Sequence, residues 1–133
     1  MNAAMATGIM AHSIELDDGH RWGTSHPAVA VIPAVLAVGE REGSSFRSIL
    51  KGIAIGYDAM LRAARAINPS HLKRGFHSTG TCGSIGAAAG SARISPSVDS
   101  LVNTILGTSP STATVACSLR SRLDAPTDTV WSP

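Results

Sequence analysis

The stretch SFRSILKGIAIGYDAMLRAARAI, residues 45–67, decides the fold class of this chain. Its larger apolar side chains recur at steps of four, four, three and four residues, at Ile49, Ile53, Tyr57, Met60 and Ala64. This spacing places them on one face of an α-helix. Ser44 or Ser45 can cap the start of the helix, and Asn68-Pro69 ends it because helical backbone is disfavoured before proline. The sequence therefore predicts a long amphipathic helix that packs against other helices.

Two further helices are expected before this stretch. Residues 3–16 carry apolar side chains at steps near three and four, which indicates the end of a helix. Pro27 suits a first helical position, so a second helix is predicted over residues 28–42, with Pro33 marking a kink or a late start. Gly43 fits the stop of that helix.

Small residues dominate the next predicted helix, which Thr79 or Thr81 would cap and which would reach Arg93. Its Gly83, Gly86, Ala87 and Gly90 share one face and would let another backbone approach closely. A polar loop or short turn is expected over residues 70–78, and one more short helix over residues 98–106.

The predicted fold class is all-α, because alternating runs of β-branched residues are absent. The pattern divides the chain into a helical part over residues 1–106 and an irregular, poorly ordered tail over residues 107–133, where prolines and scattered arginines show no periodicity.

Composition narrows the possible function. The chain has 133 residues, enough for one domain, and only 15% of them are charged. The net charge is +2 with no basic run longer than Lys73-Arg74, so a nucleic-acid-binding surface is not expected. No apolar run approaches the ~18 residues of a membrane span. Cys82 and Cys117 make no disulfide framework, and the expected location is the reducing cytoplasm.

An acidic and imidazole-rich segment interrupts the apolar runs, and its members are Asp17, Asp18, His20 and His26. It contains no lysine and is placed on a loop by its glycines. Carboxylates and imidazoles gathered beside a core are what proton transfer or metal ligation requires. The alternative is that Asp17 or Asp18 only caps a helix.

A second cluster places the cations Lys73 and Arg74 close to His77. An arginine can hold a substrate carboxylate through two parallel hydrogen bonds, and the imidazole can exchange a proton next to it. The alternative is that both cations are simply solvated.

Two other sites receive less support. Asp17, His20 and His26 offer oxygen and nitrogen ligands, but their spacing matches no closed zinc pattern, so no metal is assigned. The segment TGTCGSIG, residues 79–86, departs from both common phosphate-loop patterns, and Cys82 within it is best explained as a small packing residue.

The chain resembles the MmgE/PrpD family, which includes 2-methylcitrate dehydratase, cis-aconitate decarboxylase and iminodisuccinate epimerase. The resemblance covers residues 3–94 and rests on six motifs in order: HSIELDDGH (12–20), HP (26–27), IPA (32–34), GY (56–57), RGFHSTGT (74–81) and GAAA (86–89). It implies a helical domain and, in the parent family, a homodimer. It also implies chemistry on di- or tricarboxylates without a cofactor, started by proton abstraction next to a carboxylate.

The resemblance also implies roles for individual residues. Asp17, Asp18, His20, His26 and His77 become candidate catalytic residues, and Arg74 with Lys73 becomes the candidate binding site for a small carboxylate substrate. Glu15 is assigned less firmly, because many relatives have aspartate there.

Family members are several times longer than this chain and have a second domain. The chain is therefore expected to be a fragment of such a lyase and inactive alone. Two other functions stay open: a non-catalytic helical remnant or interaction module, and a small metal-binding helical protein.

Overall fold

The computed structural model describes residues 2–95, and within them the chain is all-α, as predicted. The expected helix over 98–106 and the expected tail over 107–133 lie outside the described residues. The elements are α1 (Asn2–His12), α2 (Pro27–Arg41), α3 (Phe46–Ile67), α4 (Ser70–Lys73) and α5 (Ser78–Ala92). The extended backbone in this part of the chain amounts to one isolated bridge between His20 and Ser25.

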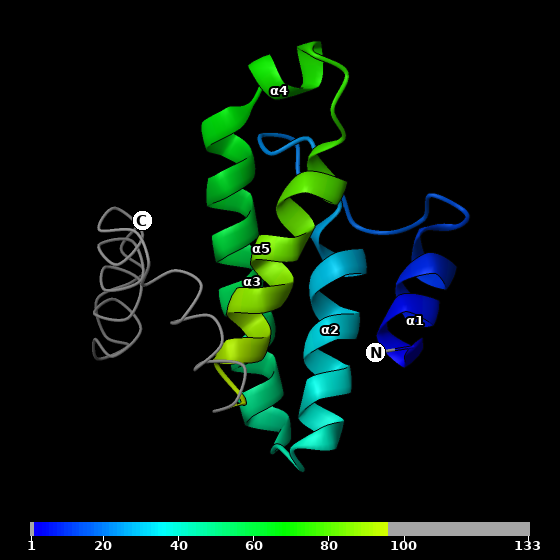
Figure 1. Cartoon of the computed structure of the whole chain (residues 1–133), viewed down its shortest axis with the longest axis vertical. Helices are drawn as coiled ribbons and strands as arrows, with labels where there is room; N and C mark the ends of the chain where they lie inside the picture. The colour runs from blue at the N-terminus through cyan, green and yellow to red at the C-terminus, as the bar shows by residue number, and fades with distance from the viewer. Residues whose placement is uncertain (1, 96–133) are drawn as a thin grey trace. The chain divides into compact units, whose positions relative to one another are not determined.

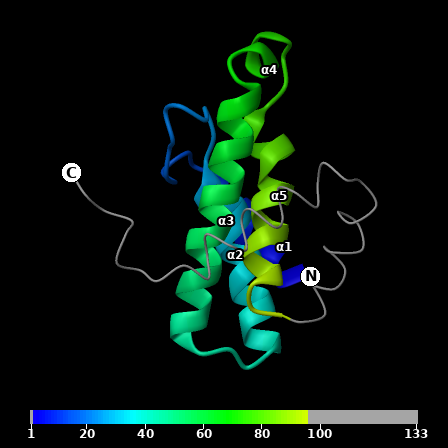
Figure 2. The ribbon, with the colours of Figure 1, turned by 90° about the vertical axis from the view of Figure 1, so that its left-hand side faces the viewer.

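Helices α2, α3 and α5 form the core of this part of the chain, and each packs against the other two (Figure 1). Helix α1 packs on α2, on the side of α2 away from α3. Viewed from the side, α3 and α5 run alongside one another (Figure 2). The core cluster consists of Val31, Val35, Met60, Ala64 and Cys82. None of the helices over residues 2–95 combines the length and apolar character that crossing a membrane requires.

Helix α3 confirms the prediction made from its apolar stripe. Met60 and Ala64 are fully buried, and Ile49, Ile53 and Tyr57 pack against the buried cluster. The Ser48 amide donates a hydrogen bond of 3.3 Å to the Ser45 side chain, so Ser45 is the residue that caps the helix.

Loss of this cap should be measurable as a loss of stability. Ser45→Ala is expected to lower the free energy of unfolding by about 1 kcal/mol, because it leaves an amide of the first turn without its acceptor. Chemical denaturation measures the change. Ser44→Ala is the matched control, since Ser44 bonds to α2 only through its backbone amide, 2.8 Å from the Gly39 carbonyl. Equal losses in the two variants would contradict the assignment of the cap.

Helix α2 begins at Pro27 and ends as the sequence predicts. Gly43 has a φ of 61°, a left-handed conformation that glycine adopts without steric cost. Its amide donates to the Glu40 carbonyl at 3.2 Å, and the Ser44 amide donates to the Gly39 carbonyl at 2.8 Å. These paired bonds are the Schellman arrangement, which satisfies the last carbonyls of a helix.

Glycines allow α3 and α5 to approach until their backbones touch. A Cβ built on Gly86 would lie 2.8 Å from the Gly56 carbonyl oxygen, and one built on Gly90 would lie 2.7 Å from the Gly52 carbonyl oxygen. Atoms at these separations overlap, so no larger residue fits without displacing a helix. The prediction that the glycine face of α5 admits another backbone is confirmed, and the partner is α3.

Two local predictions, the cap of α5 and the end of α1, differ from the structure. Helix α5 begins at Ser78 and has His77 before it, without a side-chain cap, so neither Thr79 nor Thr81 caps it. Thr79 is buried and bonded elsewhere. The short turn expected within residues 70–78 is present as the four-residue helix α4. Helix α1 stops at His12 rather than running to residue 16, and its Ile9 and Met10 are 62% and 74% exposed.

Candidate active site

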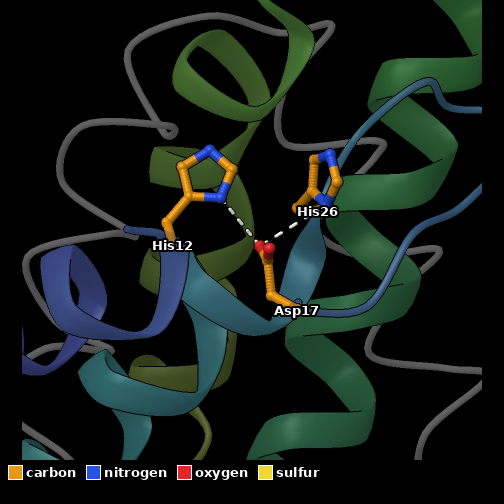
Figure 3. Close-up of side chains that lie close together, drawn as sticks. All are labelled: His12, Asp17 and His26. Atoms are coloured by element: carbon orange, nitrogen blue, oxygen red, sulfur yellow. Dashed lines mark hydrogen bonds and ion pairs between the residues drawn. The ribbon is translucent and has the colours of Figure 1, made fainter. Parts of the chain in front are cut away.

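The segment between α1 and α2, together with the ends of three helices, brings histidines from distant parts of the chain together. Figure 3 shows His12, at the last residue of α1, and His26, just before α2, on either side of Asp17. The ring of His77, just before α5, lies 6.2 Å from the ring of His12 at an angle of 26°. We call His12, Asp17, His26 and His77 the histidine cluster.

Asp17 is the buried centre of this cluster, with its side chain only 3% exposed. Its Oδ2 lies 2.8 Å from His12 Nδ1 and 3.4 Å from His26 Nδ1. Burial raises the pKa of this carboxyl, but hydrogen bonds from His12 and from the backbone, with the charges of the two imidazoles, bring the pKa below its usual value. Asp17 is therefore a carboxylate at neutral pH. Its Oδ1 is buried without a partner among the described residues.

His26 is fixed from both its backbone and its ring. Its amide donates to Thr79 Oγ1 at 3.0 Å, and its Nδ1 lies 2.6 Å from the Asp18 carbonyl oxygen. Because a carbonyl oxygen only accepts hydrogen bonds, Nδ1 must carry the hydrogen. The other ring nitrogen, Nε2, then keeps its lone pair in the neutral ring. A histidine held in this way is suited to act as a base.

Asp18 holds the loop against two helices. Its Oδ1 accepts from the Ala28 amide at 3.0 Å, in the first turn of α2, and its Oδ2 accepts from the Tyr57 hydroxyl at 3.0 Å, on α3. Burial, and then the Asp18 hydrogen bond and charge, raise the pKa of Tyr57 well above its usual value. Both carboxylate oxygens are thus occupied, which matches the alternative that an aspartate of this segment caps a helix.

His20 does not join the histidine cluster. Its Nδ1 accepts a hydrogen bond of 3.1 Å from the Gly23 amide, and its own amide donates to the Ser25 carbonyl at 2.9 Å. These bonds close a turn and give His20 the opposite tautomer to His26, with the hydrogen on Nε2. His20 still lines an open hollow of about 560 Å³ whose other walls are Gly19, Arg21, Thr24, Ser25 and His26.

Two residues at the site were not among the predicted catalytic or binding residues. His12 is the last residue of α1, five residues before Asp17, and it stands in the motif segment 12–20 without a role assigned to it. Arg21 is an exposed cation on the wall of the hollow that contains His26. In the sequence, Arg21 lies between His20 and His26, and this position was the one indication that it could bind a carboxylate near them.

The predicted basic residues Lys73 and Arg74 lie at the end of α4 and are exposed. Within residues 2–95 no hydrogen bond or ion pair joins either side chain to the histidine cluster. Gly75 follows them with a φ of 86°, which turns the chain toward His77. The structure therefore brings one member of this predicted group, His77, to the cluster and leaves the two cations apart from it.

Cys82 lies on α5 and is buried in the core cluster. Burial raises the pKa of its thiol, so the side chain is a neutral packing group at neutral pH. The interpretation of Cys82 as a small packing residue is supported by this environment.

The cluster also has the dimensions of a cation site. One ligand atom each from His12, Asp17 and His26 lies within 4.8 Å of the others. Asp17 Oδ1, which has no hydrogen-bond partner among the described residues, is an oxygen of the kind that coordinates a cation. His20, which the sequence offered as a ligand, is absent from this group. The direct hydrogen bond between His12 and Asp17 satisfies two of the three groups without an ion.

A buried carboxylate between imidazoles, carried by an all-helical scaffold, defines a candidate acid–base site. The chain belongs to the MmgE/PrpD family, because the model of the MmgE/PrpD N-terminal domain matches residues 1–131. That match extends beyond the segment 3–94 in which the motifs were recognised.

A curated relative supports the same assignment. The chain is 31% identical over 100 residues to the cis-aconitate decarboxylase-like protein oryM of Aspergillus oryzae (strain ATCC 42149 / RIB 40). The alignment covers 69% of this chain and 21% of the relative, so the chain spans about a fifth of the relative's length. No solved structure matches the chain significantly.

Proposed function

We propose that this chain forms part of a lyase or isomerase site that abstracts a proton next to a carboxylate. Its substrates would be di- or tricarboxylates such as 2-methylcitrate, and the reaction would end in loss of water, loss of CO₂ or re-protonation. The observation that supports it most directly is His26, whose Nδ1 is committed to the Asp18 carbonyl and whose Nε2 is left as a base.

The hollow beside His26 suggests how a carboxylate would be held there. Arg21 lies on its wall and can bind a carboxylate through two parallel hydrogen bonds. Arg74 and Lys73 remain proposed for a second carboxylate, which a tricarboxylate substrate would supply. Asp17 orients imidazoles within the cluster, and Asp18 fixes the loop that carries them.

The comparison supports the class of substrate. The relative's name refers to cis-aconitate, an unsaturated tricarboxylate whose decarboxylation requires charge to develop next to a carboxylate. We propose the wider class for this chain, because dehydration, decarboxylation and epimerisation all develop negative charge on a carbon near a carboxylate and need a group that takes or gives a proton there.

An exchange of segments tests this proposal. In the chimaera, residues 1–95 of this chain replace the matching segment of the oryM protein, and turnover of cis-aconitate and 2-methylcitrate is followed. We expect the chimaera to be active and the 133-residue chain alone to be inactive, because proton transfer requires all the reacting groups within hydrogen-bond reach. An inactive chimaera beside an active parent would contradict the proposal, as would turnover by the chain alone if His26→Ala abolishes it.

Experiments can distinguish this proposal from two alternatives, a non-catalytic interaction module and a metal-binding protein. A chimaera that folds, assembles and lacks activity would favour a non-catalytic interaction module. The spacing of His12, Asp17 and His26 favours the metal-binding alternative, and one equivalent of a divalent metal in purified chain, lost in Asp17→Ala, would support it. A cytoplasmic location and a homo-oligomeric state stay predictions.

A further inference from the structure

His12 connects the two histidines that the proposed chemistry uses. Its ring lies 5.1 Å from the ring of His26 and 6.2 Å from the ring of His77. It is the last residue of α1, and it reaches the site because α1 packs on α2, which His26 precedes. Resting on the proposed function, we infer that His12 is the second acid–base group of the site and that Asp17 is the residue that positions it.

The hydrogen bond to Asp17 determines which ring nitrogen of His12 is left for a substrate. Asp17 is ionised and therefore only accepts, so His12 Nδ1, 2.8 Å away, must be the donor. His12 Nε2 makes no hydrogen bond within residues 2–95 and lies 4.0 Å from Oε1 of the exposed Glu15 side chain, so it is open to gain or lose a proton. Figure 3 shows that the second ring nitrogens of His12 and His26 both lie on the side of the rings away from the carboxylate.

His12 and His26 differ in the hydrogen-bond partner of Nδ1. His12 Nδ1 lies 2.8 Å from the charged Asp17 carboxylate. His26 donates to a neutral carbonyl at 2.6 Å and lies farther from the Asp17 carboxylate, at 3.4 Å. This difference in partners is the reason for assigning His12 as the acid and His26 as the base.

In a dehydration, His26 acting as base and His12 acting as acid account for every proton. His26 Nε2 takes the proton from the carbon next to the carboxylate, and the electron pair of the carbon–hydrogen bond becomes the new double bond. The hydroxyl leaves with the electrons of the carbon–oxygen bond and takes the proton of His12, so that water is released. Transfer of a proton from His26 to His12 through solvent returns both groups to their starting states.

Asp17 explains why His12 could not act without it. An imidazole at the end of an exposed helix rotates and exchanges tautomers, whereas a buried carboxylate fixes both the ring plane and the protonated nitrogen. Asp17 therefore acts through His12 and is a positioning residue. Its second contact, to His26 Nδ1, ties the orientation of the two rings to one carboxylate.

Nitrogen NMR of the full 133-residue chain tests the inference without any need for turnover. With ¹⁵N-labelled histidine, about two pH units above the ordinary imidazole pKa of ~6.5, long-range proton–nitrogen correlations report which ring nitrogen carries the hydrogen. We expect His12 and His26 to carry it on Nδ1 and His20 to carry it on Nε2. His20 serves as the internal control, because it accepts from the Gly23 amide.

The variants Asp17→Ala and Asp17→Asn are expected to remove or weaken the preference of His12 for Nδ1–H. His20 should keep its tautomer in both, which shows that the loop is still folded. His26 should change less than His12, because the Asp18 carbonyl remains. The Asn variant preserves the shape of the side chain if the Ala variant unfolds.

Three outcomes would overturn the inference: His12 with its hydrogen on Nε2 in the wild-type chain, unchanged His12 signals in both Asp17 variants, or averaged signals from all the histidines. None of these depends on catalysis. An inactive chimaera with the expected tautomers would reject the proposed function and leave the positioning of His12 intact. An active chimaera with the wrong His12 tautomer would reject only the inference.

Discussion

His26→Ala in the chimaera is expected to lower kcat by roughly 10²- to 10⁴-fold, the usual contribution of a general acid or base. KM should change less, because the substrate carboxylates are held by other groups. Steady-state kinetics on cis-aconitate and 2-methylcitrate measure both constants. The same experiment with Arg74→Lys should mainly raise KM, since lysine keeps the charge but loses the paired hydrogen bonds.

Two further variants separate the role of His26 as a base from its structural role in holding the loop. His26→Asn retains an amide N–H near the position of Nδ1 that can donate to the Asp18 carbonyl, so its kcat should fall as far as that of His26→Ala while the fold is preserved. His71→Ala is the matched control, because His71 bonds to Thr81 and stacks on Phe76, apart from the histidine cluster. If kcat survives both His26 variants, the role of base belongs to His12, to His77 or to a residue outside this segment.

Gly86→Ala is expected to cost about 1–3 kcal/mol of unfolding free energy, in spite of the higher helix propensity of alanine. The added Cβ would lie 2.7 Å from Met60 Cβ, 2.8 Å from the Gly56 carbonyl oxygen and 2.9 Å from Val31 Cγ2. The carbonyl belongs to a helix backbone and cannot move alone, so α3 and α5 must separate. Denaturant titration of the full chain followed by circular dichroism measures the loss.

Gly80→Ala provides the control within the same helix. A Cβ on Gly80 meets only His77 Nδ1, at 3.9 Å, and the residue is exposed. That variant should be neutral or more stable by up to about 1 kcal/mol, because alanine loses less backbone entropy on folding. A Gly86→Ala chain as stable as Gly80→Ala would show that the close approach of α3 and α5 does not contribute to stability.

The sequence predicted the helical scaffold well, because its signals are local. The stripe from Ile49 to Ala64, the Ser45 cap and the Gly43 stop each depend on residues within one or two turns, and the structure confirms them. The glycine face of α5 was equally visible. Its partner face on α3 was missed because Gly52 and Gly56 carry no side chains that a hydrophobic pattern registers.

The candidate site was predicted less completely, because its geometry depends on contacts between distant segments. His26 and Asp17 lie in one cluster, and His77 is next to it through the ring of His12. His12 was not assigned, although it precedes Asp17 by only five residues, because the pattern does not show how the end of α1 lies against this loop. Asp17 and Asp18 are neighbours in the chain, yet one faces the imidazoles and the other faces the backbone of α2.

The two hydrogen bonds of the Asp18 carboxylate bear on the order in which this part of the chain folds. One of its carboxylate contacts reaches ten residues along the chain and the other reaches 39 residues, to Tyr57. The entropy of closing the longer loop must be overcome before that contact can help, so it forms only when α3 has docked on α2. We therefore expect the loop that carries the site to be fixed late, in a long-range stage of folding. Mutations that slow the docking of α3 would delay the appearance of the site, even when they lie far from every histidine.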